Sequence, residues 1–541
     1  MTRGGIPPRK RIIGTVVSAV VVFVVALAPG LIAAGSPLAA LRLPIECVVV
    51  LALLLLLPWR GARVAVAVGA AALLVLATVG AALDRVFLAE VGRPFDVATG
   101  WQELTDGYGV VSDSTGSIAA FVLLLLVSVL AVGLVAAVSA SFLRLASALR
   151  PRRRAALVGA TAATAAWAVL SIAAVQVLSG VPVAADDAVQ QVVAKAGQVA
   201  VAARDKAVFD RAASTDPYAH LPASDLLTGL RGKDVVVAFV ESYGRSAVQD
   251  SSFSAGVDAV LRRGEHQLTA HGYAERSAFL TSPTFGGISW LAHSTLQSGL
   301  WIDSQQKYDE VTAGRRLTLA GAFRKAGWRT VSDVPSDTKP WAVGSSFYGY
   351  GTELNATNVG YRGPAFSYAR VPDQYTWAYF QQHELSRPHS PLMAEIDLVS
   401  SHTPWTPLPR LLPWRSIGDG SAYDPQPAEG QPPSVVWQDP RHVQQLYGQS
   451  IQYSLESLFS FLTNTDDPNL VVVVLGDHQP ASVVSGAAAD HDVPISIIAK
   501  DPAVIQRIGG WAWQPGMLPS PTAPVWRMDA FRDRFLQAYG P

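Results

Sequence analysis

"LVVVVLGDHQP", residues 470–480, joins an uninterrupted run of apolar residues to the tripeptide Gly-Asp-His. Valine favours strands, and a continuous apolar run is typical of a strand that is buried on both faces of a parallel sheet. Asp477 and His478 follow this run, at the carboxyl end of the expected strand, where open α/β sheets bind their ligands. The stretch therefore predicts an α/β domain that holds a ligand at this strand end.

The chain from residue 233 to residue 541 alternates short apolar runs with helical patterns. This alternation predicts a largely parallel sheet covered by helices on both faces. The Pro-rich segment 404–433 predicts a long surface loop. The expected strands are 234–240, 328–333, 392–399, 470–475 and 494–499, and the expected helices are 255–271, 289–299, 314–327, 372–384 and 439–463.

Metal-binding side chains flank four of the expected strands. A single aspartate after a strand is more often a turn or helix cap, but four such groups on one edge favour a binding site. Carboxylate and imidazole together suit Zn²⁺, Mn²⁺ or a similar divalent ion. The groups are Glu241 after 234–240, His402 after 392–399, Asp477 and His478 after 470–475, and His491 before 494–499.

A serine at the start of an expected helix is the next candidate. In "TSPTFGGISWLAHSTLQSGL", residues 281–300, the pair Gly286-Gly287 permits a tight turn and the apolar pattern after Ser289 predicts a helix start. Backbone amides and the positive end of the helix dipole would surround the Ser289 hydroxyl, which favours a phosphate anion there. The local sequence supports equally well that Ser289 is an ordinary N-cap residue.

The chain up to about residue 180 is dominated by Ala, Val and Leu. A helix needs about 20 apolar residues to cross a bilayer core. In the second of five such stretches, Arg42 and Glu46 are four residues apart and are expected to pair on one helix face. The five expected transmembrane helices are about 12–34, 38–58, 64–88, 117–142 and 155–178, within a transmembrane domain 1–180.

Basic residues cluster in three of the segments that flank these helices, and five crossings place all three on one side of the membrane. The positive-inside rule assigns that side to the cytoplasm. The N-terminus is therefore expected in the cytoplasm of a multi-pass plasma-membrane protein, and residues 233–541 outside it. A cleaved signal peptide at 12–34 is the alternative, but this run is long and four more follow. The clusters are Arg9, Lys10 and Arg11; Arg60 and Arg63; and Arg144, Arg150, Arg152, Arg153 and Arg154.

Composition excludes several other classes of protein. The 42 basic and 42 acidic side chains give a formal charge of zero, so no global charge favours a nucleic-acid partner. Cys47 is the single cysteine, which excludes a disulfide within the chain and any cysteine-based metal site in residues 233–541. Between the two domains, residues 181–232 predict an amphipathic linker helix at 185–212 and a turn-rich connection.

Five motifs occur in the order found in the alkaline phosphatase superfamily: "VVVAFVESYG", "GGISWLAHSTLQSG", "SSHTPW", "VVVVLGDHQP" and "HDVPI". The resemblance covers about residues 233–500 and is nearest to the sulfatase-like branch, which contains lipoteichoic acid synthases and lipid phosphoethanolamine transferases. It implies a sulfatase-type catalytic domain outside the membrane, after five transmembrane helices.

The resemblance also implies roles for individual residues. Glu241, Ser289, Asp477 and His478 match the ligands of a divalent ion, Mn²⁺, Zn²⁺ or Mg²⁺, with Ser289 as the nucleophile. His402 and His491 match positions that hold the substrate phosphate or a second metal ion in relatives. His402 is also the expected acid that protonates the leaving oxygen.

The chain departs from family patterns at two places. "SPTFG" lacks the C/S-x-P-x-R spacing of formylglycine sulfatases, which argues against sulfate-ester hydrolysis. "TKPWAVGSSFYGYG" stands where lipoteichoic acid synthases carry a Phe-Trp-Asn-Arg type motif. Trp341 is retained there, the arginine is absent, and Lys339 is either its substitute or simply exposed. His293, one helical turn beyond Ser289, is a further expected substrate contact.

These features predict a membrane-anchored, metal-dependent phosphotransferase. The head group of a phospholipid-type donor would pass through a phospho-serine to a glycan or lipid acceptor of the cell envelope. A phosphodiesterase, phosphatase or sulfatase-type hydrolase on the same fold is the alternative. A membrane sensor or transporter subunit is the non-enzyme alternative; the metal set and the lack of deep charges in the spans argue against it.

Overall fold

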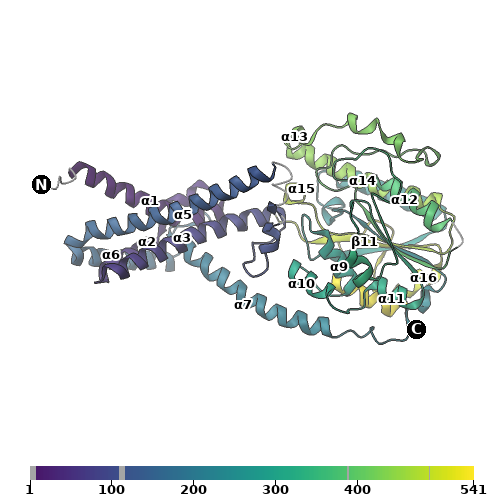
Figure 1. The fold of residues 1–541 in the computed structure, drawn as a ribbon, viewed down its shortest axis with the longest axis horizontal. Coiled ribbons are helices and arrows are strands. Elements are labelled where there is room, and N and C mark those ends of the chain that lie inside the picture. Colours follow the sequence, from purple (N-terminus) through teal and green to yellow (C-terminus); the bar gives the residue numbers. More distant parts are fainter. Residues whose placement is uncertain (1–7, 106, 109–115, 387–388, 487) are drawn as a thin grey trace. The chain divides into compact units, whose positions relative to one another are not determined.

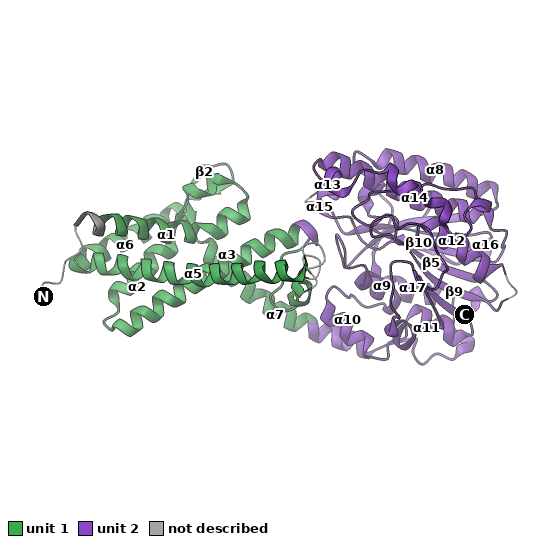
Figure 2. Cartoon of the chain, turned by 45° about the horizontal axis from the view of Figure 1, so that its top comes forward, with its two compact units in different colours: residues 1–88, 93–205 green, residues 89–92, 206–541 purple. Residues whose placement is uncertain are grey.

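The structure, a computed structural model, describes residues 8–105, 107–108, 116–386, 389–486 and 488–541. It divides into two compact units, residues 1–88 with 93–205 and residues 89–92 with 206–541 (Figure 2). The division falls inside one helix, α7 (Asp187–Ser214), which occupies the place of the amphipathic helix expected at 185–212. Each unit has its own hydrophobic core.

The first unit is built from apolar helices. Three stretches are long and apolar enough to cross a membrane: Ile12–Ala34, Arg60–Glu90 and Ser117–Ile172. The last contains two helices, because a short 3₁₀ turn at Arg150–Arg152 separates them. The helices are α1 (Pro8–Ala34), α2 (Ile45–Leu56), α3 (Arg60–Glu90), α5 (Ser117–Leu149) and α6 (Arg153–Ile172).

The second expected transmembrane helix is shorter than the sequence predicts. A 3₁₀ helix at Pro37–Leu41 and a short strand, β1 (Leu43–Pro44), precede α2, and β1 pairs with β4 (Ala184–Ala185). α2 itself has 12 residues, which is about 18 Å of helix at 1.5 Å per residue. This length falls well short of a bilayer core of about 30 Å.

The expected pairing of Arg42 with Glu46 on one helix face is wrong, because Arg42 lies before the helix. The Arg42 guanidinium instead donates to both carboxylate oxygens of Asp187, at 2.8 and 2.7 Å. Glu46 Oε1 accepts hydrogen bonds from the amides of Ala188 and Val189 in the first turn of α7. Its negative charge therefore lies at the positive end of the α7 dipole, which is favourable.

The second unit contains a nine-stranded sheet, in the order β12-β6-β11-β10-β5-β9-β7-β8 with β13 beside β6 (Figure 1). All five expected strands are present, and β6, β8, β12 and β13 are additional. The strands are β5 (Asp234–Val240), β6 (Ala274–Thr281), β7 (Arg329–Val334), β8 (Thr352–Asn355), β9 (Leu392–Leu398), β10 (Leu470–Gly476), β11 (Asp492–Ala499), β12 (Gln514–Pro515) and β13 (Val525–Arg527).

The sheet is mixed rather than wholly parallel. Strands β10, β5, β9, β7 and β8 are parallel to one another, whereas β11 is antiparallel to both β10 and β6. The beginning of β11 therefore lies at the edge where β10, β5, β9 and β6 end. This reversal brings the start of β11 and the segment that follows β6 to the edge predicted to bind a ligand.

Alternating side chains of the strands form a hydrophobic core on each face of the sheet. Val236, Ala238 and Val240 of β5 face one core, and Val237 and Phe239 face the other. Helices α12 (Asp373–Phe380) and α14 (Pro440–Asn464) cover the first face, and α9 (Ser289–Ser298) and α11 (Leu319–Ala326) cover the second (Figure 1).

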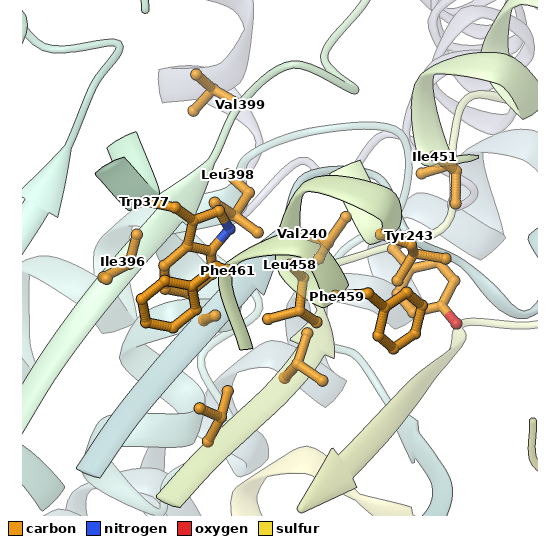
Figure 3. Close-up of a cluster of buried hydrophobic side chains, with 14 of the residues drawn as sticks. Val240, Tyr243, Trp377, Ile396, Leu398, Val399, Ile451, Leu458, Phe459 and Phe461 are labelled. Carbon is orange, nitrogen blue, oxygen red and sulfur yellow. The ribbon is translucent and has the colours of Figure 1, made fainter. Parts of the chain in front are cut away.

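Figure 3 shows the first core just below the strand ends. Trp377 of α12 stacks on Phe461 of α14, with ring centroids 4.3 Å apart. Leu398 and Val240, at the last positions of β9 and β5, belong to the same cluster. These side chains are fully buried. Their packing holds the ends of β5 and β9 in place, and so positions the backbone of the polar residues that follow.

Candidate functional site

Four polar side chains meet at the carboxyl edge of the sheet. Val240 and Gly476 are paired at the ends of the neighbouring strands β5 and β10, so the next residues, Glu241 and Asp477, lie side by side. Ser289 comes to the same place as the first residue of α9. The order of strands and the turn after β6 thus assemble residues that are far apart in the sequence.

The spacing of the four side chains fits the ligands of one metal ion. Ser289 Oγ donates to Glu241 Oε2 at 3.0 Å and lies 3.2 Å from His478 Nε2. His478 Nε2 is 3.3 Å from Glu241 Oε1 and 3.5 Å from Asp477 Oδ2. Ligands bonded tetrahedrally at 2.0–2.1 Å are about 3.3–3.4 Å from one another. These donors therefore suit Zn²⁺ or a similar divalent ion.

The imidazole of His478 is held in the form that a metal requires. Its Nδ1 lies 2.8 Å from the backbone oxygen of Gln479, and a carbonyl only accepts hydrogen bonds, so Nδ1 carries a proton. In neutral His478 the lone pair is then on Nε2, the atom that faces Glu241, Asp477 and Ser289. A backbone partner for the second ring nitrogen is the usual device for orienting a histidine ligand.

Asp477 has one satisfied and one unsatisfied oxygen. Its Oδ1 accepts hydrogen bonds from the amides of Ser242 and His478, both at 2.7 Å. Its Oδ2 is buried and has no hydrogen-bond partner among the described residues. A buried carboxylate oxygen without a partner is destabilising, and a cation at the centre of the cluster would satisfy it. The residues therefore fit a metal ion.

The electrostatics of the cluster also favour a positive charge. Burial raises the pKa of Asp477 to about 6, and the charge of Glu241 adds to this effect. Burial alone would lower the pKa of His478, but the carboxylates of Asp477 and Glu241 raise it to about 9. A proton on His478 thus balances the carboxylates when no cation is bound, and a divalent ion would displace that proton.

Backbone strain surrounds the site. Ile288 has φ 64° directly before Ser289, and Ser242 has φ 58° directly after Glu241. A positive φ is a clear outlier for a β-branched residue such as Ile288, and strained backbone of this kind concentrates at functional sites. Ile288 occupies the N-cap position of α9, while the hydroxyl of the partly exposed Ser289 is bound to Glu241. Ser289 is therefore not the N-cap residue.

His402 lies at the rim of the same edge. Its Nδ1 donates to the backbone oxygen of Thr403 at 2.7 Å, and its ring stacks on Tyr368 with centroids 3.5 Å apart. Burial would raise the pKa of Glu241, but the hydrogen bond from His478 and the charges of His402 and His478 hold it below its ordinary value. Ser401, directly before His402, donates its hydroxyl to the backbone oxygen of Glu241 at 2.6 Å, so His402 lies beside the cluster.

The other expected site residues lie around this centre. His491 directly precedes β11, and its ring lies 5.3 Å from that of Phe285 in the segment before Ser289. Lys339 is exposed. Trp341 packs on Tyr348, with centroids 4.9 Å apart. His293 faces Glu395 and Asp397 of β9, at 3.3 and 3.5 Å, one turn further along α9 than Ser289.

Three residues near the site were not expected from the sequence. Glu395 and Asp397 lie within the apolar stretch "LMAEIDLV" of β9, and residues two apart in a strand point to the same face. Two acids on one face of a buried strand are therefore a signal that the sequence does carry. Tyr368, which stacks on His402, follows no recognisable pattern.

No protein-family model matches this chain, and no curated protein sequence matches it. Among solved structures, the full-length lipooligosaccharide phosphoethanolamine transferase A from Neisseria meningitidis is 13% identical over 95% of both chains, with a TM-score of 0.43. The C-terminal periplasmic domain of EcEptC from Escherichia coli, in complex with Zn, is 12% identical over 57% of this chain and 82% of its own, with a TM-score of 0.37.

The lipoteichoic acid synthase LtaP from Listeria monocytogenes is similar as well, with 14% identity and a TM-score of 0.33 over 50% of this chain. The present chain spans 66% of the length of that structure.

Proposed function

We propose that this chain is a membrane-anchored, metal-dependent phosphotransferase in which Ser289 is the nucleophile. One observation carries the proposal: the partly exposed Ser289 hydroxyl lies 3.0 Å from Glu241 and 3.2 Å from His478, within a set of metal-binding donors. A hydroxyl placed on a metal site at a helix N-terminus is suited to attack a phosphoryl group. A binding-only sensor has no need of a nucleophile in this position.

The chain's own residues account for the covalent steps. A bound divalent ion would make the serine hydroxyl more acidic and neutralise charge on the phosphoryl oxygens. Glu241 Oε2 is placed to accept the Ser289 proton. Ser289 Oγ then bonds to phosphorus, and the bond between phosphorus and the lipid alcohol oxygen breaks. His402 is the proposed donor of a proton to that oxygen.

The second step reverses these roles. A hydroxyl group of the acceptor attacks the phospho-serine, and its proton passes to His402. The bond between phosphorus and Ser289 Oγ breaks, and the serine regains its proton from Glu241 Oε2. Apolar helices in the same chain support a phospholipid-type donor and a glycan or lipid acceptor of the envelope. With water as the acceptor, the same residues would perform hydrolysis.

A panel of labelled phospholipids distinguishes these reactions. We expect purified full-length protein to release the lipid alcohol from a phosphodiester donor and to transfer the labelled head group to an added envelope lipid or glycan. Chromatographic separation of the products measures both. Release of free head-group phosphate with every acceptor would favour the hydrolase, and no reaction with any phosphodiester would contradict the proposal.

We also propose that residues 206–541 lie outside the cytoplasm, with the N-terminus inside. The asymmetry of the basic segments supports this orientation. The short α2 makes the number of crossings decisive, because five crossings place the two ends of the chain on opposite sides and four place them on the same side. Crossing by α2 would need the flanking residues around Ile45–Leu56.

A reporter that is active only outside the cytoplasm tests this topology. Fused after residue 541, it should be active, because an odd number of crossings precedes it. Fused near residue 150, within the basic segment between α5 and α6, it should be inactive. The matched fusions differ only in position, and the reverse pattern of activity would overturn the orientation.

A further inference from the structure

A second cluster of metal-binding groups lies one helical turn along α9 from Ser289. The Nδ1 atom of His293 is 3.3 Å from Glu395 Oε1 and 3.5 Å from Asp397 Oδ1. The three ligand atoms all lie within 4.8 Å of one another. None of these residues belongs to the Ser289 site, and the proposed phosphotransfer assigns them no role.

The fold brings the three residues together in a defined way. Glu395 and Asp397 of β9 are paired with Val237 and Phe239 of β5, so their side chains point to the face that α9 covers. Phe239 stacks on the His293 ring, with centroids 3.7 Å apart and planes 11° apart. This stacking fixes the ring orientation, and Nδ1 consequently faces the two carboxylates.

The spacing of this cluster repeats that of the first site. Separations of 3.3 and 3.5 Å between the imidazole nitrogen and two carboxylates also occur between His478, Glu241 and Asp477. They match the distance of about 3.3–3.4 Å between ligands bonded tetrahedrally to one ion. As with Asp477 Oδ2, the buried Asp397 Oδ1 has no hydrogen-bond partner within the described part of the chain.

Surrounding groups orient the carboxylate of Glu395. Tyr350 donates its hydroxyl to Glu395 Oε2 at 2.8 Å, and the side-chain amide of Gln297 also donates to this oxygen. These two bonds leave Oε1 directed at His293. Outer hydrogen bonds that fix a ligating carboxylate are a regular feature of metal sites.

An unpartnered carboxylate alone does not indicate a metal, and Asp333 of β7 provides the contrast. Both of its oxygens are buried without a hydrogen-bond partner among the described residues. Asp333 is not part of either cluster found among the described residues. The His293 cluster differs because one imidazole and two carboxylates converge on one point.

We propose that His293, Glu395 and Asp397 bind a second divalent cation of the Zn²⁺ or Mn²⁺ class. The ion joins α9 to β9 one turn from the nucleophile, and so holds the helix that carries Ser289 against the sheet. The three residues act as positioning residues for Ser289. Binding does not depend on phosphotransfer, so the site exists whatever reaction Ser289 performs.

Metal analysis of the full-length protein tests the proposal. After loading with Zn²⁺ or Mn²⁺ and removal of excess metal, we expect the wild-type protein to hold about two equivalents of ion per chain. Asp397→Asn and Glu395→Gln, which keep side-chain size, should each retain about one, as should Asp477→Asn at the first site. The double variant Asp477→Asn with Asp397→Asn should hold almost none.

Asp333→Asn is the matched control, because it alters a buried carboxylate on the neighbouring strand. It should retain about two equivalents of ion. Should a variant fold poorly, anomalous diffraction from metal-loaded wild-type protein locates the ions directly, with one peak expected beside His293. Two equivalents in folded Asp397→Asn, or an anomalous peak only beside Asp477, would overturn the proposal and leave the Ser289 mechanism untouched.

Discussion

Ser289→Ala should abolish turnover of the phosphodiester donor, with a fall in kcat on the order of 10⁴-fold or more, as expected when a nucleophile is removed. The methyl group offers no oxygen to attack phosphorus and no donor for Glu241 Oε2. Glu241, Asp477 and His478 remain, so bound metal and the melting temperature should change little. Ser289→Thr keeps the hydroxyl and should keep part of the activity.

The control for this variant is Ser294→Ala on the same helix. The Ser294 side chain is fully buried on α9, where it interacts with Tyr348, so loss of its hydroxyl should leave kcat near the wild-type value. Mass spectrometry of the peptide 281–300 after a brief substrate pulse should show one adduct in the wild type and none in Ser289→Ala. A head group still attached to the phosphate indicates attack on a phosphodiester, whereas a bare phosphate indicates attack on a monoester.

Wild-type turnover by Ser289→Ala would show that another group is the nucleophile. The resemblance of the sequence motifs would then describe the fold without its chemistry. An adduct that persists on another residue of 281–300 would identify the replacement.

The sequence predicted the centre of the α/β domain well, because burial dominates there. The valine run of β10 and the run of β5 are buried at every position, so hydrophobicity alone locates them. Strand β6 was missed because "AERSAFLT" begins with Glu275 and Arg276, which break an apolar run. Their backbone still pairs with β11, and pairing with a distant strand leaves no local signal.

The membrane part shows a different limit. Apolar length predicted five crossings. Length cannot detect the strand pair between β1 and β4, which occupies residues just before Ile45, where α2 begins. Likewise, Arg42 pairs with Asp187, which is 145 residues away, and not with a neighbour on a helix face. In both cases a contact with a distant segment replaced the local pattern.

The residues of the site that directly follow buried strands could be predicted from the sequence. Glu241, Asp477 and His478 directly follow buried strands, and Gly-Gly marks the turn before Ser289. Glu395 and Asp397 were not proposed as ligands, because they lie inside a strand rather than after it. Their partner, His293, belongs to a helix whose position over the sheet no local pattern specifies.

Asp477→Asn should remove metal from the Ser289 site and lower kcat by at least about 100-fold, since loss of a metal ligand has larger effects than the 10–100-fold typical of outer partners. Asp477 Oδ1 is committed to the amides of Ser242 and His478. The asparagine oxygen will occupy that place, because an amide nitrogen cannot accept from backbone N–H groups. The uncharged NH₂ group then replaces Oδ2 beside His478, where it cannot bind a cation.

Chelation of the wild-type protein should produce the same loss of activity, and added Mn²⁺ or Zn²⁺ should restore it in the wild type but not in Asp477→Asn. Asp333→Asn controls for removal of a buried carboxylate and should behave as the wild type. Counting metal separates the two proposed sites: Asp477→Asn should retain about one equivalent at His293 if both exist. If a folded, inactive Asp477→Asn protein binds as much metal as the wild type, Asp477 is not a ligand of the ion at the Ser289 site. The unpartnered Asp477 Oδ2 beside His478 would then need another explanation.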